Sequence, residues 1–128
     1  MNIDKIQIIL NYAYPKIKSY YGKGKLDYPT IELHEDIYAR ITGEPEQRGE
    51  HSTTSKAQYE HHVNTIYIYH PNMMNEEDVL RSLIHEYTHY TQNSKLFSKY
   101  KAIYSYDEDP TEIEAHKNEE NWQMFSQN

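Results

Sequence analysis

The sequence predicts a single small α+β domain covering residues 1–128, and three features carry this prediction. A chain of 128 residues can bury one hydrophobic core. Apolar residues recur every three or four positions in residues 3–17, which is the spacing of one helix face. In residues 65–69 isoleucines alternate with threonine and tyrosines, which is the period of a β-strand.

The composition excludes several classes of protein. The net charge is −7 and no basic patch gathers anywhere, so no nucleic-acid partner is expected. No run approaches the roughly 18 apolar residues of a membrane span, and the N-terminus lacks the pattern of a signal peptide. Cysteine is absent, which excludes disulfides and thiolate ligands. We therefore expect a cytoplasmic protein without a membrane partner, whose 14 tyrosines help to build the core.

The first half of the chain is predicted to contain a helix, a strand and two less regular segments. The helix starts at residue 3 and should end or kink near Tyr14, because Pro15 lacks a backbone donor and clashes with the preceding turn. Residues 29–33 are expected to form a strand. Residues 35–42 suit a short helix or a strand, whereas residues 43–55 have the composition of a surface loop. Beside an active site such a loop can also serve as a lid.

Two further strands are predicted before the most informative part of the chain. Residues 57–59 and 63–69 are expected to pair with each other. His61 and His62 are adjacent, so on a strand they point to opposite faces and do not easily share one metal ion. Five histidines are expected to lie at the surface or to be satisfied by hydrogen bonds: His34, His51, His61, His62 and His70.

Residues 75–93 are predicted to form a helix that is buried on most sides. Asn75 is a suitable N-cap, and three acidic residues follow it in the first turn, where they suit the helix dipole. Apolar residues cover most of the circumference and leave one polar stripe, formed by Ser82, His85, Glu86, His89 and Asn93. A last helix is expected from Pro110, capped by Asp109 or Thr111.

The polar stripe contains the pentapeptide His85-Glu86-Tyr87-Thr88-His89, which has the pattern HExxH. Residues i and i+4 of a helix lie on one face, so His85 and His89 can bind the same metal ion. Glu86 then projects beside the metal, where its carboxylate can act on a bound water. The alternative is an amphipathic helix whose histidines lie on a solvated face.

A hydrolytic zinc site needs a third protein ligand, and residues 112–116 offer Glu112, Glu114 and His116. Glu112 and Glu114 are roughly 160° apart on a helix, so they cannot both face the metal. Ala115 lies one turn after Glu112, and its small side chain lets the two helices approach closely. We therefore expect Glu112 to be the third ligand and keep Glu114 as the alternative.

The HExxH pentapeptide followed by Glu112-Ile113-Glu114-Ala115 resembles the gluzincins, the thermolysin-like and minigluzincin-type metallopeptidases. The resemblance implies a zincin-like fold: a short twisted sheet packed on the HExxH helix, an N-terminal helix and a C-terminal ligand-bearing helix. It implies residues 63–69 as the edge strand of the cleft. It also implies one Zn²⁺ per chain, bound by His85, His89 and Glu112. His116 departs from the family, because many gluzincins have there an aspartate that holds a metal-bound histidine.

The resemblance implies zinc-dependent hydrolysis of a peptide or protein substrate, with Glu86 as general base toward a metal-activated water. Three residues are candidates for stabilising the oxyanion: Tyr104, Tyr106 and His116. The alternative function is a catalytically silent zincin-like binding module. Its structural zinc would have four protein ligands, for instance His85, His89, Glu112 and His116. Substrate preference and oligomeric state do not follow from the sequence.

Overall fold

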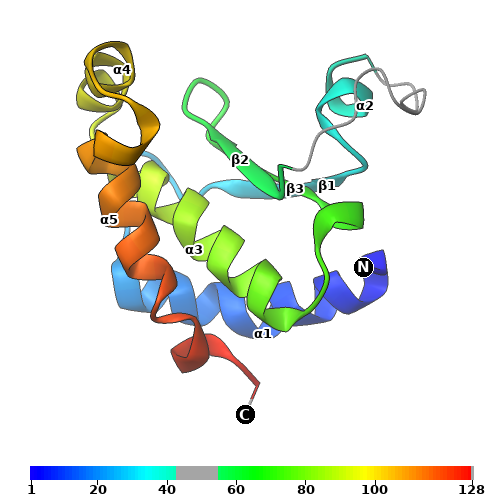
Figure 1. Ribbon diagram of the computed structural model, residues 1–128. Helices are drawn as coiled ribbons and strands as arrows, with labels where there is room; N and C mark the ends of the chain where they lie inside the picture. Colours follow the sequence, from blue (N-terminus) through cyan, green and yellow to red (C-terminus); the bar gives the residue numbers. More distant parts are fainter. Residues whose placement is uncertain (43–54, 128) are drawn as a thin grey trace.

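The computed structural model describes residues 1–42 and 55–127. The expected loop at 43–55, which includes His51, therefore lies outside the described residues except for Ser55. Within these residues the chain has a mixed α+β fold, which confirms the predicted class (Figure 1). The helices are α1 (Ile3–Tyr21), α2 (Ile37–Thr42), α3 (Glu76–Thr91), α4 (Ser94–Ile103) and α5 (Pro110–Glu119). The strands are β1 (Thr30–His34), β2 (Ala57–Glu60) and β3 (Thr65–Tyr69), and short 3₁₀ helices cover His70–Asn72, Tyr106–Glu108 and Trp122–Phe125. None of the described helices has the length and apolar character needed to cross a membrane.

The three strands form one sheet in the order β1-β3-β2 (Figure 1). β3 pairs parallel with β1 and antiparallel with β2, so the predicted pairing of the last two strands is confirmed. The prediction that the segment 63–69 is an edge strand is wrong, because β3 is central and all five of its residues are buried. Its parallel partner β1 comes from a distant part of the chain, and no local pattern in the sequence predicts that the two strands pair. The edge strand beside the HExxH helix is β2.

A tight turn at residues 61–64 replaces the start of the expected last strand. Asn64 has a φ of 47°, a left-handed conformation that Asn adopts more readily than most residues. Its Oδ1 accepts a hydrogen bond from the Tyr59 hydroxyl at 2.7 Å, and its Nδ2 donates one to the carbonyl of Asp27 at 2.7 Å. His61 and His62 therefore lie in a turn rather than on a strand.

α1 continues through Pro15 to Tyr21. The prediction that the helix could end near Tyr14 is therefore wrong. Proline removes one hydrogen bond from a helix interior. Ala13 and Ile17 lie on either side of it, and both are fully buried in the core, which offsets that loss. The helix ends at Gly22, whose φ of 83° is accessible to glycine at no steric cost.

α3 is the central helix of the fold and packs against α1, α5 and β2 (Figure 1). The predicted N-cap is confirmed, because Asn75 Oδ1 accepts a hydrogen bond from the backbone N–H of Asp78 at 2.9 Å. Its apolar side joins the core with residues of α1 and β3, among them Ile6, Ile66, Ile68, Leu80 and Leu83. The two histidines of the polar stripe do not face open solvent, since His85 and His89 are only 9% and 4% exposed.

Two segments without a definite prediction are helical. Residues 37–42 form α2, and the Asp36 carboxylate accepts a hydrogen bond from the N–H of Ala39 at 2.6 Å, as an N-cap does. α3 ends at Thr91 rather than at Asn93, which instead caps α4 by accepting hydrogen bonds from its first turn. α4 has no buried residue and follows α3 after a short break. It is therefore a surface helix whose position depends on a few side-chain contacts.

Buried and half-buried tyrosines predict a loss of stability at alkaline pH. Burial raises the pKa of Tyr59 to about 12 and raises the pKa of Tyr14 and Tyr87 as well, above the unfolded value of about 10. Because the folded pKa is the higher one, this stability is fully present below pH 10 and is lost as pH rises further. We expect the thermal unfolding midpoint to fall by roughly 5–10 °C between pH 8 and pH 11.

Replacing the two tyrosines Tyr14 and Tyr87 with phenylalanine should make this fall smaller, because those two positions no longer titrate. Tyr20→Phe is the matched control, since its side chain is exposed and should leave the pH dependence unchanged. An unfolding midpoint of the parent that is the same at both pH values would contradict the prediction.

Candidate active site

A cavity of about 480 Å³ lies between β2, α3, α4 and the first turn of α5. β2 lines it along its whole length, and α4 contributes Phe97 and Ser98. The remaining lining includes His85, Glu86, His89 and Glu112. The structure thus brings to one cavity all four residues that the sequence predicts as metal ligands or catalytic base.

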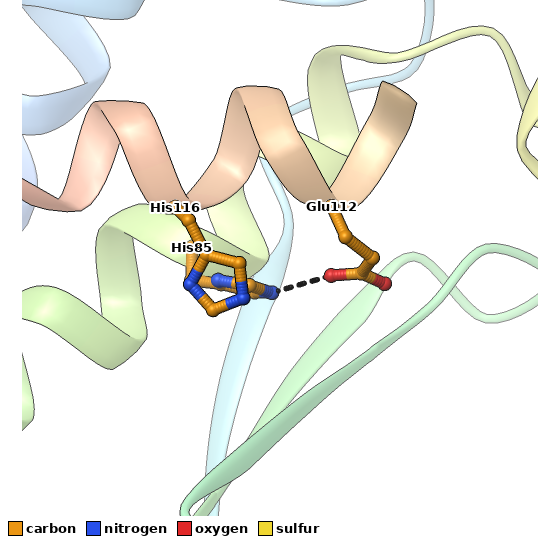
Figure 2. Close-up of side chains that lie close together, drawn as sticks. All are labelled: His85, Glu112 and His116. Carbon is orange, nitrogen blue, oxygen red and sulfur yellow. Dashed lines mark hydrogen bonds and ion pairs between the residues drawn. The ribbon is translucent and has the colours of Figure 1, made fainter. Parts of the chain in front are cut away.

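Both imidazoles of the HExxH helix face the same carboxylate oxygen. His85 Nε2 lies 2.8 Å from Glu112 Oε1, and His89 Nε2 lies 3.1 Å from the same atom. All three residues are less than a tenth exposed. Figure 2 shows Glu112 on α5 reaching toward His85 on the neighbouring helix α3. Two imidazoles and a carboxylate therefore converge from two packed helices, which is a donor set suited to a divalent metal.

A second grouping of potential ligands replaces His89 with His116. The ligand atoms of His85, Glu112 and His116 all lie within 4.8 Å of one another (Figure 2). Both ring nitrogens of His116 already have partners, namely the Tyr106 hydroxyl at 2.8 Å and Glu119 Oε2 at 2.9 Å. The His116 side chain is also 52% exposed. We give more weight to His89, which is buried and directs a ring nitrogen at Glu112.

The other ring nitrogen of each inner histidine is held by an acceptor that sequence reasoning missed. His85 Nδ1 lies 2.6 Å from Glu119 Oε2, and His89 Nδ1 lies 2.7 Å from Gln92 Oε1. Such partners orient a ligating imidazole and leave Nε2 for the metal. The carboxylate that holds His85 is thus supplied by Glu119 and not by residue 116, which is a histidine. The spacing of seven residues between Glu112 and Glu119, about two helical turns, is the sequence signal that could have identified Glu119.

Charged neighbours stabilise the ionised form of Glu112. Burial opposes its charge, but His85, His89 and Lys101 together hold the pKa of Glu112 well below its usual range. Burial likewise opposes the charge on His85, whereas Glu112 and Glu119 raise the pKa of His85 to about 10. Lys101 was not predicted to take part in the site. Its ammonium forms ion pairs with Glu112 Oε2 and with Asp109 Oδ2.

Glu86 is held by the edge strand rather than by the two helices. Its Oε1 accepts a hydrogen bond from the backbone N–H of Tyr59 on β2 at 2.9 Å. Burial raises the pKa of Glu86, against the opposing effect of His85 and His89. A carboxylate with a raised pKa, fixed beside two imidazoles in a cavity, is suited to accept and release a proton.

Among the candidates for oxyanion stabilisation, only Tyr106 lines the cavity. Its hydroxyl is bonded to His116, and burial raises the pKa of Tyr106 to about 12, so it is a neutral hydroxyl donor. His116 does not line the cavity but is hydrogen-bonded to Tyr106, which does. The Tyr104 ring packs against Tyr100 at 5.6 Å between centroids and is 41% exposed.

Other predicted residues lie outside the converging group. The carboxylate of Glu114 is exposed and accepts a hydrogen bond from Gln92 Nε2 at 2.8 Å. His61 lines the cavity and has a ring nitrogen 3.1 Å from the carbonyl of His89, so its hydrogen-bonding capacity is satisfied as expected. It lies between the rings of Tyr59 and Phe97, with centroid distances of 4.7 and 4.8 Å.

No protein-family model, curated protein or solved structure matches this chain. The interpretation of the site therefore depends on its own donors and their geometry. Imidazole and carboxylate side chains are the usual protein ligands of hydrolytic zinc sites, and the adjoining cavity leaves room for water and substrate. The donors present could thus hold a divalent metal ion.

Proposed function

We propose that this chain is a zinc-dependent peptidase of zincin-like architecture. The observation that carries the proposal is the approach of His85 Nε2 and His89 Nε2 to one oxygen of Glu112, in a cavity that also contains Glu86. His85, His89 and Glu112 would hold the ion. When bound, zinc supplies a Lewis acid that activates water and polarises a carbonyl group.

Glu86 carries the proton in this reaction. It takes a proton from the water whose oxygen attacks the carbonyl carbon of the peptide bond. As the bond between carbon and nitrogen breaks, it gives that proton to the leaving amine. The N–H of Tyr59 keeps the carboxylate in place for both transfers, because it bonds one oxygen and leaves the other available.

β2 offers a docking edge for an extended substrate. The carbonyl of Lys56 accepts a hydrogen bond from the N–H of Tyr69 on β3. In an antiparallel pair every second residue points its backbone N–H and C=O at the partner strand, so Gln58 and Glu60 also point theirs at β3. The backbone groups of Ala57 and Tyr59 point the other way. They border the cavity, but the N–H of Tyr59 is already bonded to Glu86. A peptide lying along this edge would therefore pair as an added strand through the N–H of Ala57 and the carbonyl of Tyr59.

We assign oxyanion stabilisation to Tyr106. Of the three candidates, Tyr106 is the one that lines the cavity. A hydroxyl donor near the developing negative charge favours the transition state over the ground state. His116 Nε2 lies 2.8 Å from the Tyr106 hydroxyl, which has a single proton. To donate to the oxyanion, the hydroxyl must therefore turn that proton away from His116.

A binding module with a structural zinc is the second candidate function. The grouping of His116 with His85 and Glu112 favours it, because a fourth protein ligand would close the site. Retention of zinc by the variant His116→Ala would argue against this candidate, since a closed site would lose one of its four ligands.

The proposed function predicts about one zinc per purified chain, bound through His85. Elemental analysis of the parent reports which metal is present, and His85→Ala should have lost it. His62→Ala is the matched control, since that side chain is 77% exposed and lies away from the cavity. Full zinc retention by His85→Ala would overturn the proposal. A peptide-library assay with the parent then tests for cleavage.

A further inference from the structure

We propose that Lys101 is a positioning residue that makes Glu112 a one-oxygen ligand. The role rests on the proposed function, because it concerns the same metal site. Its basis is the unequal environment of the two carboxylate oxygens of Glu112.

Each oxygen of Glu112 has its own partners. Oε1 faces Nε2 of His85 and of His89, at 2.8 and 3.1 Å. Oε2 accepts a hydrogen bond from the ammonium of Lys101. Glu112 is only 5% exposed, so water cannot readily replace these partners. The carboxylate therefore presents one oxygen to the imidazoles and turns the other away from them.

The ammonium of Lys101 is itself fixed by the start of α5. Its Nζ lies 2.7 Å from Asp109 Oδ2 and 3.4 Å from Thr111 Oγ1. Asp109 is 1% exposed, and its other oxygen caps α5 by accepting the N–H of Thr111 at 2.9 Å. An ammonium has three donors, and all three acceptors belong to the first turn of α5 or its cap. Lys101 thus cannot move without breaking bonds to this helix start.

This arrangement sets how the carboxylate can bind a metal. Bringing both oxygens to the ion would break a charge-assisted hydrogen bond between Lys101, whose side chain is 35% exposed, and the buried Oε2 of Glu112. A carboxylate that binds through both oxygens occupies one more coordination position than a carboxylate that binds through one. Hydrolytic zinc sites keep a position open for water. Among the described residues, Lys101 is the only lysine or arginine that forms an ion pair with Glu112.

The test is the visible absorption of Co²⁺ added to the metal-free full-length protein. Four-coordinate Co²⁺ absorbs several-fold more strongly than Co²⁺ with five or six ligands. The parent should show the strong band, and Lys101→Met should show a band that is several-fold weaker at saturating Co²⁺. A purely structural role would alter the melting temperature and leave this spectrum unchanged. Lys99→Met is the matched control: it removes the same charge from an exposed position on α4.

Two outcomes separate this role from the proposed function. If the parent binds no Co²⁺, the metal site itself fails, and the role of Lys101 fails with it. If the parent shows the strong band and Lys101→Met shows the same band, the role alone is overturned. Should Lys101→Met be unfolded by circular dichroism, the double variant Lys101→Met/Asp109→Asn replaces it. Asparagine retains the helix cap and removes the second charge that Lys101 neutralises.

Discussion

Glu86→Gln is expected to lower the rate of peptide hydrolysis by about 10²–10⁴-fold while leaving the fold and the zinc content unchanged. Glutamine has the shape of glutamate, and its carbonyl oxygen can still accept the N–H of Tyr59. It cannot accept a proton from water at neutral pH. The measurement is kcat/KM on a peptide found by library screening, together with elemental analysis and thermal unfolding of the same preparations.

The control for this variant is Glu77→Gln, on the same helix. The side chain of Glu77 is 45% exposed and pairs with Arg81 away from the cavity, so hydrolysis should be unchanged. Activity of Glu86→Gln within a few-fold of the parent would show that Glu86 is not the base. If zinc is bound and a broad library yields no cleavage, the binding module becomes the favoured function.

The second large effect is expected for zinc affinity when Glu112 is removed. Glu112→Ala should weaken binding by more than about 100-fold, because loss even of a group that only supports a ligand costs 10- to 100-fold. Competition with a chromophoric chelator gives this affinity. Glu114→Ala is the comparison, since its carboxylate is exposed and bonded to Gln92, and it should bind zinc nearly as the parent does.

The two alanine variants also decide which face of α5 carries the ligand. A large loss for Glu114→Ala together with little change for Glu112→Ala would mean that α5 is rotated by about half a turn when metal binds. Equal and small changes in both variants would mean that neither carboxylate is a ligand.

The features best predicted from the sequence are those with a local physical cause. The N-cap at Asn75 and the apolar face of α3 depend on spacing within one helix, and both are confirmed. The common side of His85 and His89 follows from the same helical geometry. Glu112 could be chosen over Glu114 because the two lie on different sides of one helix and the small Ala115 shares the side of Glu112.

The features missed depend on contacts between distant segments. Glu119 and Lys101 acquire their roles only when α4 and α5 lie beside α3. The spacing of Glu119 from Glu112 indicates a shared helix side but not the contact with His85, and Lys101 has no pattern of its own in the sequence. The continuation of α1 through Pro15 reflects burial of its neighbours in the core, a tertiary effect that outweighs local preference. The central position of β3 likewise depends on β1, whose Thr30 pairs with Thr65.

The open edge of β2 also bears on self-association. An exposed strand edge can template the addition of a strand from a second molecule, which leads to aggregates. β2 is only four residues long, and its open edge borders the cavity, which α4 lines from another side. The presence of α4 on the same cavity limits the space beside this edge. The recess beside β2 therefore disfavours edge-to-edge pairing of folded molecules through this strand, one of the two edges of the sheet.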